Sequence, residues 1–184
     1  MAEPLLLAQY HDAVTAALKN IEWVRYADAY PERNVPCFSG LTTPAVYFTI
    51  NSWEQGGGNE GQLNVELSCD LFIVVDSSGV GITRPEIFLR TAAADITQWI
   101  DGQQFGMTQI EPAVFIDAAR DEFDPRMDDY LVWRIAFTQG AAFGSDPFAR
   151  ISNPLSTAWL GVSPDIGRQH VDDYQLIYEA KPDE

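Results

Sequence analysis

Residues 62–76, QLNVELSCDLFIVVD, constrain the fold more than any other part of this 184-residue chain. Apolar side chains occupy every second position, and up to Phe72 the alternate positions are polar. This period of two predicts a long strand with one buried face. From Phe72 onward both faces are apolar, so we expect a helix to cover one face and a neighbouring element or partner subunit the other. The alternating apolar residues are Leu63, Val65, Leu67, Cys69, Leu71, Ile73 and Val75.

One helix is predicted before this strand in the sequence and one after it. Apolar residues between Leu6 and Ile21 recur at intervals of three and four, which indicates about four helical turns, with Pro4 in the first turn. A second helix is expected after Thr83, which has capping-box spacing to Glu86, and its stop is expected at Gly102.

Further strands complete an α+β fold, a mostly antiparallel sheet packed against the two helices. We predict strands at 45–53, 110–118 and 130–139, a short edge strand at 23–26, and a loop over 29–44. One core is expected between sheet and helices. Its predicted members are Leu63, Val65, Leu67, Leu71, Ile73, Leu89, Ile96, Trp133, Ile135 and Phe137.

A Gly-rich stretch separates the first two long strands and includes Gly56, Gly57 and Gly58. A phosphate-binding loop would need a following Lys-Ser/Thr pair and a helix, and here a strand follows. The stretch is better explained as a flexible hairpin tip that becomes ordered on meeting a partner.

Residues 117–129 are crowded with acids. Calcium binding is disfavoured because the EF-hand spacing and its turn glycine are missing and two arginines intervene. Two carboxylates for glycoside hydrolysis remain an alternative, although nothing in the sequence selects a pair. We predict an exposed acidic loop at a hairpin tip. Its acids are Asp117, Asp121, Glu122, Asp124, Asp128 and Asp129.

No catalytic, cofactor or metal signature is found. His11 is expected on a helix surface and His170 in a solvated tail, and no Ser lies in a G-x-S-x-G setting. Cys37 and Cys69 lack metal-ligand spacing and are expected to be free thiols in a reducing compartment. The N-terminus has neither a basic n-region nor a long apolar run, so we expect a non-enzymatic cytoplasmic protein without a membrane span.

The net charge bears on whether this protein could bind DNA or only let it pass. Eleven basic and 27 acidic residues give a net charge of −16, too negative for a surface that neutralises phosphates. A like-charged wall can still let DNA pass without holding it. The composition therefore argues against DNA binding and permits DNA passage.

Residues 144–184 contain large apolar side chains without helical or strand period. They are too apolar for a disordered tail, so we expect an extended C-terminal arm laid over its own body or a neighbouring subunit. Trp159 is the expected anchor, because aromatic residues carry much of the energy of interfaces. The predicted subunit-contact residues are Phe148, Trp159, Ile166, Tyr174 and Tyr178.

The element order over 5–143, with the segments TPAVYFTI, RPEIFLRTAAADITQWI and YLVWRIAFTQ, resembles the tail terminator and tail-completion proteins of tailed bacteriophages. The resemblance implies a domain over 1–143 that forms a hexameric ring, caps the tail tube, ends tail growth and joins tail to head in the virion neck. It also implies contacts with the tail tube protein, a sheath protein and a head-completion or connector protein.

Other functions remain open beside this one. The arm over 144–184 is longer than the family minimum, so another neck, connector or contractile-apparatus assembly protein is the first alternative. A small acidic enzyme or ligand-binding domain is the second. If a hexamer forms, six copies at −16 carry −96 formal charges, and the acids must be segregated to the lumen or one rim for the ring to close.

Overall fold

The computed structural model describes residues 5–31, 41–57, 61–78, 81–121, 129–145 and 156–179. The chain divides into two compact units, Met1–Phe148 and Ala149–Glu184. The first unit contains the two α-helices and a five-stranded sheet, and the second contains a two-stranded sheet.

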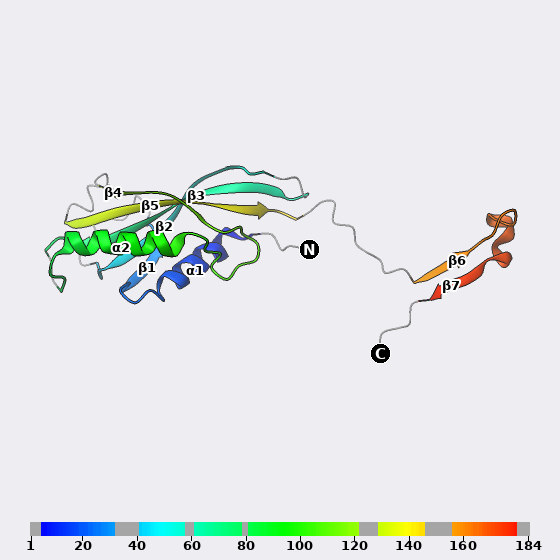
Figure 1. Cartoon of the computed structure of the whole chain (residues 1–184), viewed down its shortest axis with the longest axis horizontal. Helices are drawn as coiled ribbons and strands as arrows, with labels where there is room; N and C mark the ends of the chain where they lie inside the picture. Colours follow the sequence, from blue (N-terminus) through cyan, green and yellow to red (C-terminus); the bar gives the residue numbers. More distant parts are fainter. Residues whose placement is uncertain are drawn as a thin grey trace. The chain divides into compact units, whose positions relative to one another are not determined.

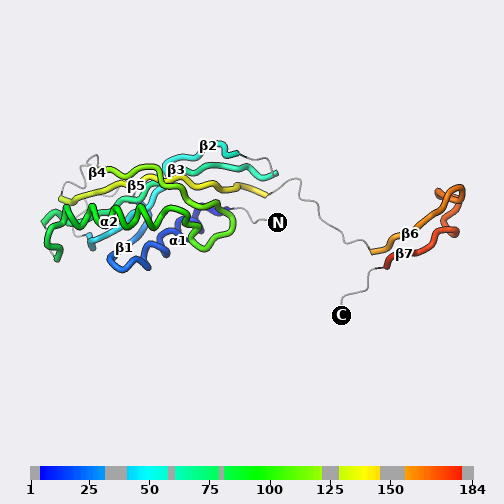
Figure 2. The backbone as a smooth tube through the Cα atoms, viewed as in Figure 1, coloured from blue at the N-terminus to red at the C-terminus, as the bar shows by residue number. Residues whose placement is uncertain are grey.

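The sheet of the first unit confirms the predicted α+β class (Figure 1). Its strand order is β1-β2-β3-β5-β4, which places the predicted long strand β3 at the centre. Only β1 and β2 pair in parallel, and the other neighbours are antiparallel. Figure 2 shows β2, β3 and β5 running side by side. The strands are β1 Tyr26–Ala29, β2 Ala45–Gln55, β3 Leu63–Asp76, β4 Val114–Asp121 and β5 Tyr130–Phe143.

Helices α1 (Leu7–Leu18) and α2 (Pro85–Ile100) pack on one face of this sheet (Figure 1). Antiparallel partners face the same side of a sheet, so the odd-numbered residues of β3 and β5 share the helix-covered face. The predicted alternation along β3 is therefore confirmed. The main core joins Tyr10, Val14, Leu18, Val46, Phe48, Val65, Leu67, Leu71, Ile73, Leu89, Ile96, Ile135 and Phe137.

Two predicted core residues differ from expectation. Leu63 is 56% exposed, because it begins β3 opposite Phe143, the last residue of β5, where the sheet ends. Trp133 is half-buried and packs at the margin of the core. Position within a strand, as well as its alternation, decides how deeply a side chain is buried.

Several predicted boundaries are also wrong. Thr83 does not cap α2: the N-cap is Arg84, with φ 135° and no side-chain cap hydrogen bond. The strand predicted at 110–118 begins at Val114, and Ile110 makes only an isolated bridge to Ala141. The edge strand lies at Tyr26–Ala29 instead of 23–26. Gly102 ends α2 as expected, with φ 83° immediately after the C-cap Asp101.

The second half of β3 is buried on both faces, as predicted. A smaller apolar cluster on the face opposite the helices contains Ala45, Tyr47, Phe72, Val74 and Val132. Tyr30 and Leu41, which flank β1 and β2, pack against it. Connecting segments of the same chain thus cover this end of the second face, where a neighbouring element or partner subunit was expected.

The second unit is a hairpin of β6 (Thr157–Leu160) and β7 (Gln175–Glu179), joined through the 3-10 helix η2 (Arg168–Asp173). An extended arm without strand period is the prediction for these residues. The strands have four and five residues and a register shift between Ala158 and Trp159, so they are too short and irregular to show a clear alternation.

Burial along β3 predicts a graded cost of truncation. Leu67 is fully buried, so Leu67→Ala should lower the free energy of unfolding by about 2–5 kcal/mol. Leu63→Ala removes the same atoms from an exposed position and should cost less than about 0.5 kcal/mol. Denaturant titration of both variants measures the difference, and equal losses would contradict the register of β3.

Candidate functional site

The face of the five-stranded sheet opposite the helices gathers acidic side chains, and we call it the acidic face. The strand registers place on it the even-numbered residues of β3 and β5 and the residues paired with them. Arg134 is the one basic side chain that the five strands direct to this face. The carboxylates on the acidic face are Asp28, Glu54, Glu66, Asp70, Asp76, Asp117 and Asp121.

Arg134 compensates the negative charge of two carboxylates on this face. Its guanidinium donates to Asp70 Oδ1 at 3.2 Å and to Asp117 Oδ2 at 2.8 Å. Asp70 is only 7% exposed and also accepts a hydrogen bond from Asn51 Nδ2 at 2.7 Å. A buried carboxylate requires such charged and polar partners. Arg134 therefore joins β3, β4 and β5 from the acidic side.

Away from Arg134, like charges lie next to each other. Glu54 and Glu66 are direct cross-strand partners and both are exposed, an arrangement that destabilises a sheet modestly. Glu66 is in turn paired with Gly140 on β5. A Cβ atom at Gly140 would lie 2.5 Å from Glu111 Oε2, so a third carboxylate rests over this glycine. The acids form a patch here without a base among the strands.

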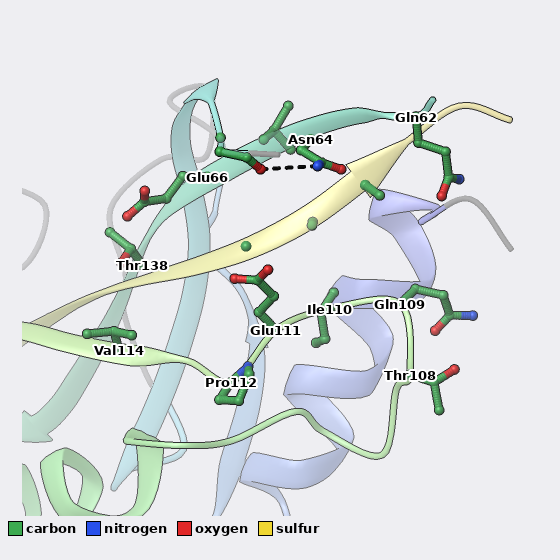
Figure 3. Close-up of a pocket in the computed structure, with 16 residues that line it drawn as sticks. Gln62, Asn64, Glu66, Thr108, Gln109, Ile110, Glu111, Pro112, Val114 and Thr138 are labelled. Carbon is green, nitrogen blue, oxygen red and sulfur yellow. Dashed lines mark hydrogen bonds between the residues drawn. The ribbon is translucent and has the colours of Figure 1, made fainter. Parts of the chain in front are cut away.

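This patch borders a groove of about 600 Å³ at the end of the sheet. Figure 3 shows Asn64 and Glu66 from β3 on one side and the segment carrying Gln109 and Glu111 on the other. Asn64 Nδ2 donates to the Gly57 carbonyl at 3.1 Å, which ties the groove to the end of β2 (Figure 3). The lining side chains are amides, hydroxyls, carboxylates and small apolar groups, which suit polar or cationic groups better than anions.

Gln139 holds the wall of this groove from inside the core. It is 1% exposed, and its Nε2 donates to the carbonyls of Gln103 at 2.9 Å and Glu111 at 2.7 Å. Tyr10 of α1 donates its hydroxyl to Gln139 Oε1 and lies 3.9 Å from Cys69 Sγ. Burial raises the pKa of Tyr10 and raises the pKa of the Cys69 thiol to about 12. The network is therefore neutral and structural at physiological pH.

The predicted acidic loop is only partly a loop. Asp117 and Asp121 belong to strand β4, on the acidic face, and Asp129 is exposed directly before β5. Glu122, Asp124 and Asp128 lie outside the described residues. The expectation of a tip loop fails for the first two acids because β4 stays paired with β5 as far as Asp121, which lies opposite Val132.

Other predicted sites have mixed outcomes. Gly56 is held against β3 because its N–H donates a hydrogen bond to the Asn64 carbonyl at 2.9 Å. Gly57 follows it, and Gly58 lies outside the described residues. Flexibility of this tip stays a prediction. His11 is not a free surface residue: its ring lies 4.8 Å from the Phe48 ring, and burial lowers its pKa.

Four of the five residues predicted as subunit contacts, Trp159, Ile166, Tyr174 and Tyr178, lie in the second unit. Trp159, Ile166 and Tyr178 are exposed, whereas Tyr174 covers Gly161 with its ring and accepts the Gly167 N–H at 2.9 Å. Tyr174 thus stabilises the hairpin turn itself. A pocket of about 270 Å³ lies beside Trp159, Val171 and Tyr174. Phe148 lies outside the described residues, and Cys37 does as well.

Sequence reasoning did not single out Gln139, Asp70 or Glu111. One signal for Gln139 was present, because it is a polar residue at the next position of the buried alternation Leu131, Trp133, Ile135, Phe137. The roles of Asp70 and Glu111 depend on partners 64 and 29 residues away, Arg134 and Gly140. No local pattern indicates such pairs.

Comparison with known proteins finds no matching family model and no matching curated sequence. Within the part of the chain that the structure describes, no helix is long and apolar enough to span a membrane. The function must therefore be argued from the geometry of this chain.

Removal of Arg134 tests the electrostatics of the acidic face. Arg134→Gln leaves Asp70 buried without its cation and should lower the free energy of unfolding by about 1–3 kcal/mol. Asp70→Asn in the same chain should restore part of this loss. Arg90→Gln is the matched control, because Arg90 forms an exposed pair with Glu86 at 3.4 Å and should cost less than about 0.5 kcal/mol. Equal effects in a urea titration would contradict the role of Arg134.

Proposed function

We propose that this protein is a structural component of a bacteriophage virion, which forms a ring that caps the tail tube and joins tail to head. The observation that carries the proposal is the segregation of acids to the helix-free face of the sheet, with Arg134 as its one basic side chain. The resemblance of the element order over 5–143 to tail terminator and tail-completion proteins supports the same role. In this proposal the acidic face lines the lumen.

The electrostatic reasoning links the face to DNA passage. DNA binding gains free energy when Lys and Arg displace counterions from phosphates. A wall with seven carboxylates and one arginine in its strands offers almost no such gain and repels the backbone at short range. DNA can therefore move through the ring without being held by it.

The second unit supports assembly into a ring. Its hairpin exposes large apolar side chains, among them Trp159, Leu160 and Ile177, which a small hairpin cannot bury alone. Contact with a neighbouring copy would cover them, as proposed for the C-terminal arm. The partners in the virion would be the tail tube, a sheath, and a head-completion or connector protein.

Size-exclusion chromatography with light scattering tests the ring. The full chain should be multimeric, or should close into rings when tail tubes are added. A chain ending at Phe143 retains the whole main core and should fold but assemble poorly. If the shortened chain forms the same multimer at the same concentration, the second unit has no role in assembly. A full chain that stays monomeric with tail tubes would contradict the ring.

Charge reversal tests the lumen. Glu54→Lys with Glu66→Lys should leave stability nearly unchanged, because both side chains are exposed. Phage carrying these changes should form complete particles that eject DNA slowly and infect poorly. Asp12→Lys with Asp95→Lys makes the same charge change at exposed positions on the helices and should infect normally. Equal infectivity of the two double variants would contradict a lumenal position of the acidic face.

A further inference from the structure

Among the described residues, strand β2 has an unpaired edge over its second part, 49–55. β1 pairs only with Ala45–Phe48, and Tyr30 N–H closes that pairing on the Phe48 carbonyl at 2.7 Å. Over 49–55 no described strand pairs with the side of β2 that faces away from β3. Such an edge presents unpaired N–H and C=O groups, which can accept another strand.

The direction of the free backbone groups follows from the pairing with β3. Gly56 donates its N–H to the Asn64 carbonyl at 2.9 Å, so Gly56 faces β3. Backbone groups of successive strand residues point to opposite edges. The N–H and C=O of Gln55 therefore point to the open edge, and so do those of Trp53. Trp53 is also 54% exposed and packs on Phe143, so an added strand could cover its ring.

The second unit contains a sheet that lacks a further strand. An isolated two-stranded hairpin is at best marginally stable in water, and a third strand is needed for independent stability. All five residues of β7 are exposed, and three of them, Leu176, Ile177 and Tyr178, are large and apolar. In the described part of the chain β7 pairs only with β6, and no described strand lies on its other edge.

We propose that β7 of one copy adds as a strand to the open edge of β2, 49–55, in a neighbouring copy. This inference rests on the proposed ring and specifies its subunit contact. Head-to-tail donation is a heterologous contact, and in a closed ring it gives every copy one filled edge and one donated hairpin. Main-chain hydrogen bonds would hold the added strand, and contact of Trp53 with apolar side chains of β7 would favour one register.

The connection between the units is long enough for donation. Eleven peptide steps separate Ser145 from Ser156 and span at most about 40 Å. They begin beyond Phe143, whose ring lies 5.9 Å from that of Trp53, at the sheet end where the β2 edge is open. The connection therefore starts at the end of the sheet where its own copy has the unpaired stretch of β2.

Charge favours a neighbouring copy over the same chain. To reach its own β2 edge, the chain must return from β5 past β3 and β2. The hairpin carries Asp165, Asp172, Asp173 and Glu179 against Arg168, so the acidic face would repel it along that path. A hairpin arriving from the next copy can approach the edge from outside the sheet.

Disulfide mapping in the full chain tests this contact. Both chains carry Cys37→Ser, and buried Cys69, with its pKa raised to about 12, stays unreactive. One chain carries Gln55→Cys, and a second, tagged chain carries Leu176→Cys, Ile177→Cys or Tyr178→Cys. Mild oxidation of the mixture should give a mixed dimer with at least one of the three. Asp95→Cys on α2 replaces Gln55→Cys in the control and should give none.

A second variant tests the backbone hydrogen bonds. Gln55→Pro removes an N–H that points away from β3, so the β2–β3 pairing is kept, and the assembly constant should fall about tenfold. Unchanged assembly by light scattering would overturn strand addition.

The outcomes separate this inference from the proposed ring. Multimers without a Gln55→Cys disulfide to β7 would overturn the strand contact and leave the ring standing. A further chain carries Gln55→Cys together with the β7 cysteine. If it forms a disulfide within itself and no dimers, donation to a neighbour is overturned. A full chain that stays monomeric with tail tubes would overturn both proposals.

Discussion

The buried amide of Gln139 is the interaction on which the geometry of the first unit most depends. An amide in an apolar core costs free energy unless its donors and acceptor are satisfied. Its three hydrogen bonds reach Tyr10 on α1 and the carbonyls of Gln103 and Glu111 in the segment after α2. One side chain therefore fixes a helix, a long connection and strand β5 relative to each other. It also places Glu111 over Gly140, which shapes the groove.

The same strands separate apolar from acidic surface. Alternation along β3 and β5 directs leucines, isoleucines and Phe137 to the helices and leaves the carboxylates on the other face. The separation is incomplete where Phe72, Val74 and Val132 make the second apolar cluster. Between that cluster and the groove, Arg134 compensates Asp70 and Asp117. Toward the groove, Glu54 and Glu66 lie opposite each other without a basic side chain on the strands beside them.

Patterns within one element were predictable, and contacts between elements were not. The period of two along β3 and the apolar stripe of α2 were sufficient for the α+β class and most of the core. Leu63 was misplaced because alternation says nothing about where a sheet ends. Thr83 had the capping-box spacing, yet Arg84 takes the N-cap position. The Arg134 ion pairs and the strand order, which create the acidic face, join residues distant in sequence and leave no local signal.

Among the described residues, each unit has a strand edge that no other described strand pairs with, and this links stability to assembly. The β2 edge over 49–55 and the outer edge of β7 would each be paired or covered in a chain that works alone. Exposed edges favour association, while a charge of −16 per copy opposes it. The two tendencies are compatible if copies meet along strand edges and apolar hairpins and keep their acidic faces apart from those contacts. The proposed ring with an acidic lumen would satisfy both conditions, because adjacent copies would meet edge to edge and the repelling faces would border a shared open channel.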